Sequence, residues 1–141
     1  MQYVFKSEPG VRYRFPQHVT DLIVDRSESK CSEVFMVFME PGKGTPLHRH
    51  EDTEQVFFVL EGAGILTIGQ ERQHFPLVPG DVVRIPPSVW HATQATDTSR
   101  LKYFSVDSFP GALPANETTW DDHIKVVCVE RGWDYSRVRE A

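Results

Sequence analysis

Short apolar runs separated by turns rich in glycine and proline recur along most of the chain. The longest run covers residues 33–39 and is stopped by Pro41-Gly42. Runs rich in β-branched and aromatic residues predict β-strands. We therefore expect strands over residues 33–39, 45–50, 55–60, 65–68, 82–85, 90–93, 101–106 and 124–129, with a return strand at 74–75. Many short strands joined by such turns are typical of a sandwich or a barrel.

Helical spacing is rare by comparison. We expect short helices at most over residues 16–22 or 120–123. Residues 107–119 predict an ordered surface loop, because their prolines, glycine and small residues do not build a strand core. The aromatic residues of the following tail predict that it packs on the barrel or on a second subunit; they are Trp120, Trp133 and Tyr135.

The length of 141 residues is that of one ordinary domain. We predict a single all-β domain over residues 1–141. Its barrel core is expected at about residues 33–106, with N-terminal strands in 1–32 and a loop and strand extension in 107–141.

Charge and composition exclude several classes of partner. The net charge is -5, from 20 acidic and 15 basic residues, and the basic residues are scattered, so nucleic acid and anionic membranes are not expected partners. No signal peptide and no apolar run long enough to span a bilayer is visible, which predicts a cytoplasmic protein. Cys31 and Cys128 are expected as free thiols, although the sequence does not give the distance between them.

The first chemical signal is a pair of histidines, His48 and His50, on a predicted strand. Side chains two positions apart on a strand point to the same face, so both imidazoles can reach one ion. Imidazole is the commonest protein ligand for Zn, Fe, Cu and Ni. Such a pair alone is weak support for a metal site.

Two spaced motifs strengthen the signal. The first runs Gly, five residues, His-x-His, four residues, Gln, six residues, Gly, and consists of Gly42, His48, His50, Gln55 and Gly62. The second runs Gly, five residues, Pro-x-Ser, two residues, His, three residues, Ala, and consists of Gly80, Pro86, Ser88, His91 and Ala95.

With these motifs the chain resembles the cupin superfamily, and in particular small single-domain cupins. The resemblance implies a jelly-roll barrel, also called a double-stranded β-helix. It implies one divalent metal ion held by His48, His50 and His91, with Gln55 as the fourth ligand. It also implies a small-molecule ligand and a homodimer, since small cupins commonly dimerise.

The chain departs from the family pattern at three positions. Gln55 stands where the family has a metal-binding Glu, and the neighbouring Glu54 is the alternative ligand. A shift of one residue moves a strand side chain to the opposite face, and the turn at Gly62 favours Gln55 inside. Ser88 replaces a glycine, which is tolerable if that turn needs no positive φ, and Ala95 replaces an asparagine.

The neutral donors predict the chemistry of the ion. Three imidazoles and an amide cancel none of its charge, so the site should attract oxygen anions such as carboxylates or enolates. They favour Fe(II) over Fe(III), and Fe, Ni, Cu or Zn over Mg or Ca. One or two coordination positions should stay open, as in catalytic sites.

The sequence also predicts where several other side chains lie. The pocket walls are expected to consist of Phe57, Val59, Val83 and Ile85. We expect His18 and His123 to be surface or tail residues and His74 to be a partly exposed strand histidine, with the barrel mouth as its alternative place. Arg49 and Arg84 are expected to point outward, and Tyr103 is a weaker candidate for the pocket.

These features favour a metal-dependent enzyme, dioxygenase-like or isomerase/lyase-like, acting on a small anionic or oxygen-chelating substrate. The alternative is a cupin that binds or senses a ligand without turnover. A purely structural role ranks lowest, because three buried histidines are costly without a partner.

Overall fold

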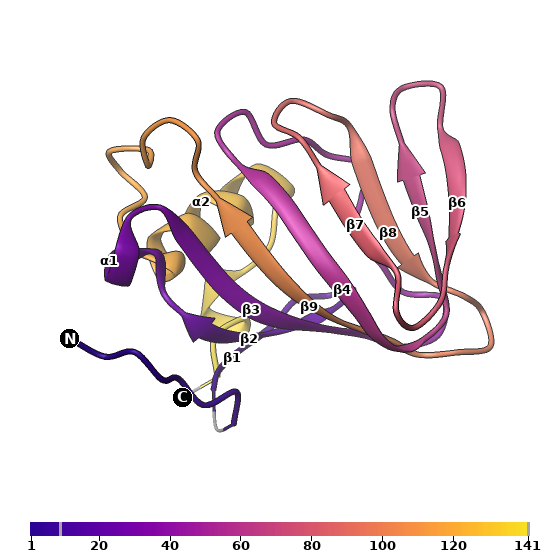
Figure 1. The fold of residues 1–141 in the computed structure, drawn as a ribbon, viewed down its shortest axis with the longest axis horizontal. Coiled ribbons are helices and arrows are strands. Elements are labelled where there is room, and N and C mark those ends of the chain that lie inside the picture. The colour runs from indigo at the N-terminus through magenta and orange to yellow at the C-terminus, as the bar shows by residue number, and fades with distance from the viewer. Residues whose placement is uncertain (9, 141) are drawn as a thin grey trace.

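The computed structural model describes residues 1–8 and 10–140, which form two antiparallel sheets curved into a jelly-roll barrel (Figure 1). The larger sheet has the order β1 (Val11–Arg14), β2 (Val19–Val24), β3 (Ser32–Met39), β9 (Leu101–Ser108), β4 (Glu54–Gly62), β7 (Val82–Ile85). The smaller has the order β6 (Gln73–Leu77), β5 (Gly64–Ile68), β8 (His91–Ala95). The helical segments are α1 (Arg26–Ser29), α2 (Trp120–Arg131) and a 3-10 turn at Tyr135–Arg137. The all-β prediction is confirmed.

Alternation along the strands separates a buried inner face from an outer face. In β3, Phe35, Val37 and Met39 are buried, whereas the residues between them are only partly covered. This period of two is the strand geometry itself, since successive side chains point to opposite sides of the sheet. The core therefore lies between the inner faces of the two sheets.

The turn at Gly62 pins the register of β4. Gly62 has a φ of +86°, and a Cβ there would lie 1.7 Å from the carbonyl oxygen of Arg100. Only glycine fits such a close approach in this conformation. Between Gly62 and Gln55 the pairing of β4 with β9 shifts by one residue at a bulge between Val59 and Glu61, and the resulting register places Gln55 opposite Asp107 on β9 and Ile85 on β7.

The prediction of a strand over 124–129 is wrong, because this segment lies in the middle of α2. Its β-branched residues suggested a strand, but the buried positions Trp120, Ile124, Val127 and Cys128 follow helical spacing. The Thr119 hydroxyl accepts a hydrogen bond from the backbone N–H of Asp122 at the N-cap, and Gly132 ends the helix with a φ of +70°.

Two further local predictions also fail. Residues 45–50 form no continuous strand; the segment makes a single bridge, between His48 and His91, and Pro46 lacks the N–H that a ladder needs. Residues 16–22 were a candidate helix, but residues from Val19 onward belong to β2.

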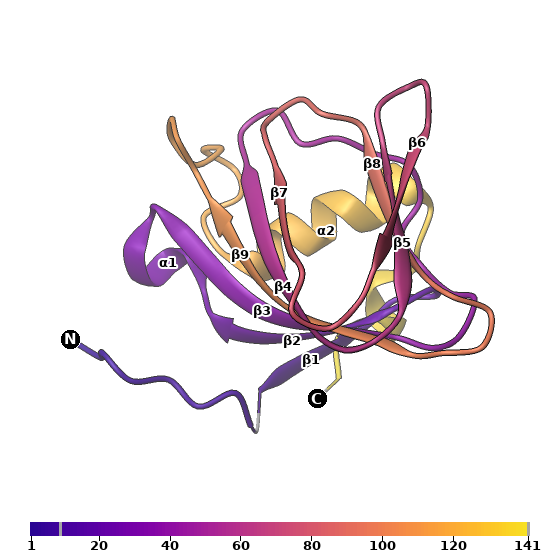
Figure 2. The same ribbon diagram turned by 45° about the vertical axis from the view of Figure 1, so that its right-hand side comes forward.

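Helix α2 covers the open side of the barrel, and Figure 2 shows it crossing behind β4, β7 and β8. Two hydrogen bonds to the N-terminal part of the chain hold its first turn. The backbone N–H of Trp120 donates to Asp25 Oδ1 over 3.1 Å, and the Tyr13 hydroxyl donates to Asp121 Oδ1 over 2.9 Å. The aromatic tail thus packs on the barrel, as predicted, and Trp120 is only 5% exposed.

Two other expectations concern the cysteines and membrane helices. Cys31 is exposed and Cys128 is buried, and both are free thiols, as predicted.

Within the described part of the chain, none of the helices has the length and apolar character needed to cross a membrane.

A buried ion pair anchors the loop that leads into α2. Arg26 and Glu33 are almost inaccessible, and their side chains meet through two hydrogen bonds of 2.8 and 3.1 Å. A third hydrogen bond runs from Arg26 Nη1 to the carbonyl oxygen of Glu117 over 3.0 Å. The guanidinium therefore links α1, β3 and the segment before α2.

We expect Arg26→Met to lower the free energy of unfolding by about 3–5 kcal/mol, because Glu33 would remain as a buried charge without its partner. Urea denaturation followed by circular dichroism measures the change. The control is Arg100→Met, which removes an exposed pair with Glu40 and should change stability by less than about 1 kcal/mol. Equal effects of the two substitutions would contradict the role of burial.

Candidate metal centre

The pairing of His48 with His91 joins the two sequence motifs. The two residues form an antiparallel bridge, in which the His48 N–H donates to the His91 carbonyl over 3.0 Å and the His91 N–H donates back over 2.8 Å. The first residue belongs to the loop between β3 and β4, and the second begins β8. Backbone hydrogen bonds thus hold the two imidazoles side by side.

Three imidazoles converge at one place in the barrel. Their ring centroids lie 4.3 Å apart for His48 and His91, 4.9 Å for His48 and His50, and 5.7 Å for His50 and His91. One ring nitrogen from each lies within 4.8 Å of those of the other two. The structure therefore brings together the three histidines that the motifs singled out.

Backbone carbonyls orient two of these rings. His48 Nδ1 lies 2.6 Å from the Pro46 carbonyl oxygen, and His91 Nδ1 lies 2.9 Å from that of Val89. Each Nδ1 then carries the proton, which leaves the Nε2 lone pair for an ion. His91 Nε2 is buried and has no hydrogen-bond partner among the described residues. A buried nitrogen of this kind fits a metal ligand.

The environment keeps the three histidines neutral. Burial lowers the pKa of His48 to about 2 and that of His50 to about 3, and neighbouring histidines add to both shifts. Burial also lowers the pKa of His91. Neutral imidazole is the form that binds a metal, so the rings need not lose a proton at neutral pH.

The structure places Gln55 in the cavity wall and Glu54 on the outer face. Gln55 Nε2 donates to Ser105 Oγ over 2.9 Å, which leaves the amide oxygen as the free donor atom. Glu54 forms an ion pair with Arg84, with 2.7 Å between Oε1 and Nε. The contact at Gly62 and the bulge between Val59 and Glu61 together set the register that places the neutral side chain in the cavity.

The turn at Ser88 supports the loop that carries His50. Ser88 has a φ of +67°, so this turn does need the conformation in which the related motif has glycine. Its N–H donates to the His50 carbonyl over 2.7 Å, and its hydroxyl donates to Glu51 over 2.7 Å. These two hydrogen bonds stabilise the strained backbone conformation of Ser88.

The histidines face a cavity of about 90 Å³ between the barrel wall and α2. The wall from the barrel side includes Thr20, Phe35, Val37, Gln55, Thr93, Tyr103 and Asp107. The wall from the tail includes Trp120, His123, Ile124, Val127, Arg131 and Trp133. The space suits an ion together with a small ligand.

His18 and His123 were expected as surface or tail residues; His123 does belong to the tail, but both line this cavity. His123 Nδ1 lies 2.6 Å from Glu117 Oε1, and its ring centroid is 6.3 Å from that of His50. Helix α2, of which the sequence pattern indicated only a short stretch at residues 120–123, brings it there. His74 is exposed, as are Arg49 and Arg84, as expected.

Asp107 was assigned to the surface loop but lies on β9 in the cavity wall. Its neighbours Leu101, Tyr103 and Ser105 alternate inward along the strand, which is the signal that could have placed it. Burial and the nearby Glu33 carboxylate raise the pKa of Asp107 well above its ordinary value. Its neutral form adds no negative charge to the cavity.

The four residues predicted as pocket walls belong to the core instead. Phe57, Val59, Val83 and Ile85 are all buried, but the cavity is lined by other residues. They lie on the expected inner face, where close packing of the barrel leaves them no contact with the open space. Tyr103, the weaker candidate, does line the cavity.

Comparisons with known proteins agree with this geometry. Over 93 residues the chain is 33% identical to quercetin 2,3-dioxygenase of Bacillus subtilis (strain 168), which covers 65% of this chain and 27% of that protein. It is 33% identical over 88 residues to auxin-binding protein 4 of Zea mays, covering 55% of this chain and 43% of that protein. The chain thus spans less than half the length of these curated relatives.

The fold matches solved structures at lower identity. A predicted oxalate decarboxylase from Thermotoga maritima superposes with a TM-score of 0.68 at 18% identity, covering 76% of this chain and 99% of that one. Such a likeness shows the shared barrel. Residues 35–107, just over half of the chain, match the sequence model of the Cupin domain, so the chain belongs to the cupin family.

Proposed function

We propose that the protein is a mononuclear metal-dependent enzyme acting on a small anionic, oxygen-chelating organic substrate. The observation that carries the proposal is the convergence of His48, His50 and His91, with the buried His91 Nε2 lacking any described partner. Gln55 is proposed as the fourth ligand through its amide oxygen. The reaction class is dioxygenase-like or isomerase/lyase-like.

The donor set fits a divalent Fe, Ni, Cu or Zn ion. A bound ion of this kind supplies Lewis acidity to a chelated oxygen anion or exchanges electrons with dioxygen. The neutral donors leave its charge uncompensated, so anionic oxygen ligands are favoured. Helix α2 limits the access of water to the centre, which strengthens charge interactions there.

His123 is the chain's own candidate for proton transfer. Its Nδ1 is hydrogen-bonded to Glu117, so its Nε2 is the nitrogen without that partner. The ring lines the cavity close to His50. An imidazole held by a carboxylate can accept or donate a proton at its other nitrogen. We propose that it moves a proton to or from the bound substrate.

The size of the cavity bears on the substrate. The relative from Bacillus subtilis is named for quercetin, and the space beside the histidines consists of the cavity of about 90 Å³ and a hollow of about 620 Å³ that His48, His50 and His123 also line. The similarity to auxin-binding protein 4 supports the alternative of binding without turnover. Substrate turnover by the metal-loaded protein separates the two functions, since a binding protein would retain its ligand unchanged.

We expect the purified protein to contain about one transition-metal ion per chain, as measured by inductively coupled plasma mass spectrometry. His48→Ala should abolish metal binding, since it removes one of three converging imidazoles. Gln55→Ala should weaken the affinity on the order of tenfold or more.

Glu54→Ala is the matched control, because it changes the adjacent side chain on the outer face. It should leave the metal content unchanged. Loss of metal in Glu54→Ala with retention in Gln55→Ala would contradict the assignment of the fourth ligand. A wild-type protein that takes up none of Fe, Ni, Cu or Zn would contradict the enzymatic proposal.

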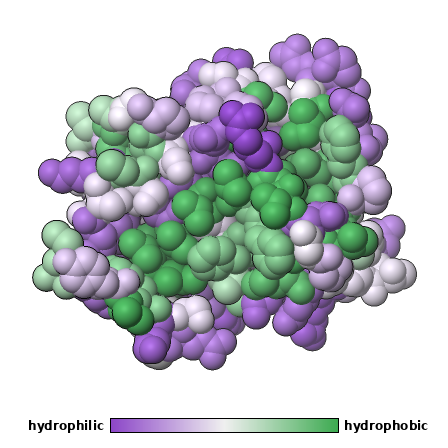
Figure 3. Space-filling view, viewed as in Figure 1, coloured by the Kyte–Doolittle hydropathy of each residue, from purple (hydrophilic) through white to green (hydrophobic). Residues whose placement is uncertain are grey.

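We also propose a homodimer formed through the outer face of the larger sheet. Figure 3 shows a continuous hydrophobic band across this face. On β4 and β7 its exposed members are Val56, Phe58, Leu60 and Val82. Monomers rarely expose a large contiguous apolar patch, and a two-fold dimer covers the same patch on both copies.

Sedimentation velocity tests this interface. The wild type should sediment as a dimer, and Phe58→Lys should shift it toward the monomer, because a charge would then lie in the buried apolar face. Val129→Lys is the control, since Val129 is 84% exposed on α2, away from the sheet face. A monomeric wild type would contradict the proposal.

A further inference from the structure

Arg131, the last residue of α2, is a cation on the wall of the metal cavity. It is partly buried, and it borders two surface hollows in addition to the cavity. Its guanidinium carbon lies 5.2 Å from the centre of the Trp133 ring. This packing holds the side chain where the cavity meets the exterior.

The guanidinium has no anionic partner in residues 1–8 and 10–140. The ion pairs among the described residues are formed by other side chains, and no side-chain hydrogen bond there involves the Arg131 guanidinium. Burial lowers the pKa of Arg131, which reflects the loss of water around it. Arginine stays protonated in proteins, so the half-buried guanidinium presents a positive charge where the cavity opens, with the neighbouring Glu130 as the carboxylate that acts on it without an ion pair.

Other polar atoms on the same wall also lack partners. His18 Nδ1 and Trp120 Nε1 are buried and unpaired among the described residues. His18 belongs to the Arg131 end of the cavity, because its ring centroid lies 6.5 Å from that of Trp133. Buried polar atoms are normally hydrogen-bonded, so a ligand that supplies acceptor or donor atoms would complete this wall.

The charge balance of the cavity favours an anion there. Arg131 is the permanent cation among the described residues of the wall, and Asp107, whose pKa is raised by burial and by the Glu33 carboxylate, is the carboxylic acid. The guanidinium fork matches a carboxylate in shape and charge. The cavity of about 90 Å³ has room for a carboxylate beside the ion, and Arg131 also borders the hollow of about 620 Å³ that His48 and His50 share.

We propose that Arg131, with His18 beside it, binds the carboxylate of a small 2-oxo or 2-hydroxy acid, whose second oxygen reaches the metal centre. The inference rests on the proposed metal-dependent function and names the substrate class for it. Both residues lie outside the matched region 35–107. The subsite therefore comes from β2 and α2, which flank the family's barrel core in this chain.

Isothermal titration calorimetry of the full-length protein loaded with zinc tests the subsite. The probes are lactate and pyruvate, compared with the neutral analogues lactamide and pyruvamide. We expect the acids to bind more tightly than the amides. Arg131→Gln should weaken the binding of the acids about 10- to 100-fold, because it removes a charge-assisted contact, and should leave that of the amides unchanged.

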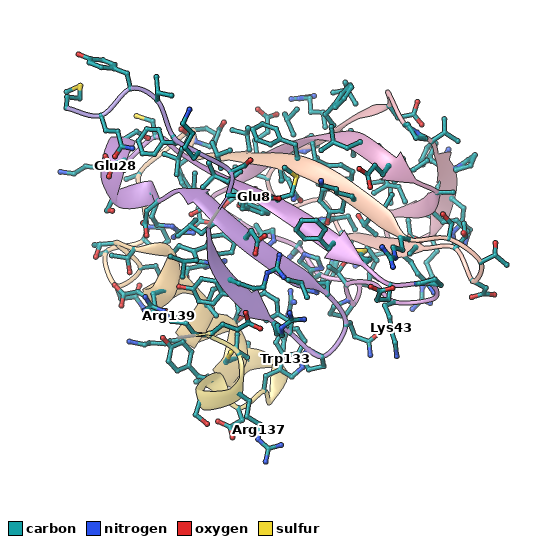
Figure 4. The ribbon with its side chains drawn as sticks, turned by 90° about the horizontal axis from the view of Figure 1, so that it is seen from below. Glu8, Glu28, Lys43, Trp133, Arg137 and Arg139 are labelled. Carbon is teal, nitrogen blue, oxygen red and sulfur yellow. The ribbon has the colours of Figure 1, made fainter. Side chains whose placement is uncertain are left out.

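Arg131→Lys keeps the charge but loses the fork, and should give an intermediate affinity. Arg137→Gln is the control, because Arg137 projects from the tail into solvent with its side chain 87% exposed (Figure 4). It should bind all four probes like the wild type. Circular dichroism and zinc content verify that each variant is folded and loaded.

The outcomes separate this inference from the metal function. Zinc-loaded Arg131→Gln that binds lactate and pyruvate with wild-type affinity would overturn the inference and leave the metal centre standing. Equal binding of acids and amides by the wild type, or no binding of either acid, would overturn it as well. Arg131-dependent binding of lactate to a chain that takes up no metal would support the subsite while removing the metal function.

Discussion

The backbone bridge between His48 and His91 is the interaction on which the candidate site depends. It joins a loop to the first residue of β8, and so converts two distant sequence motifs into one cluster of imidazoles. The carbonyls of Pro46 and Val89 then set which nitrogen of each ring stays free. Because the main chain provides this order, the ligands are oriented before any ion arrives, which lowers the entropy lost on binding.

Helix α2 decides the electrostatic character of the site. A barrel open to water would screen charges, whereas the helix encloses the histidines with aromatic, aliphatic and polar side chains. The same burial keeps His48 and His50 neutral and raises the pKa of Asp107. The permanent positive charge on the cavity wall is that of Arg131, and it makes this end of the cavity receptive to an anion.

The attachment of that helix is polar and lies at the far end of the larger sheet. Asp25 accepts from Trp120 at the start of α2, and the Arg26–Glu33 pair holds the carbonyl of Glu117 just before it. A buried pair of this kind adds little net stability, but its directional hydrogen bonds specify one arrangement of the loop. The position of α2 over the cavity thus depends on residues that do not contact the proposed metal.

The amino-acid sequence by itself determined the barrel and the three histidines, because strand alternation and motif spacing are local properties of the chain. It left Gln55 and Glu54 open, and the close contact at Gly62 together with the bulge between Val59 and Glu61 set the register that placed Gln55 inside. It misread residues 124–129 of α2, because their β-branched side chains favour a strand locally and the packing of the helix on the barrel overrides that preference. His18, Asp107, His123 and Arg131 became site residues through tertiary structure alone, because their cavity forms only when β2, β9 and α2 meet.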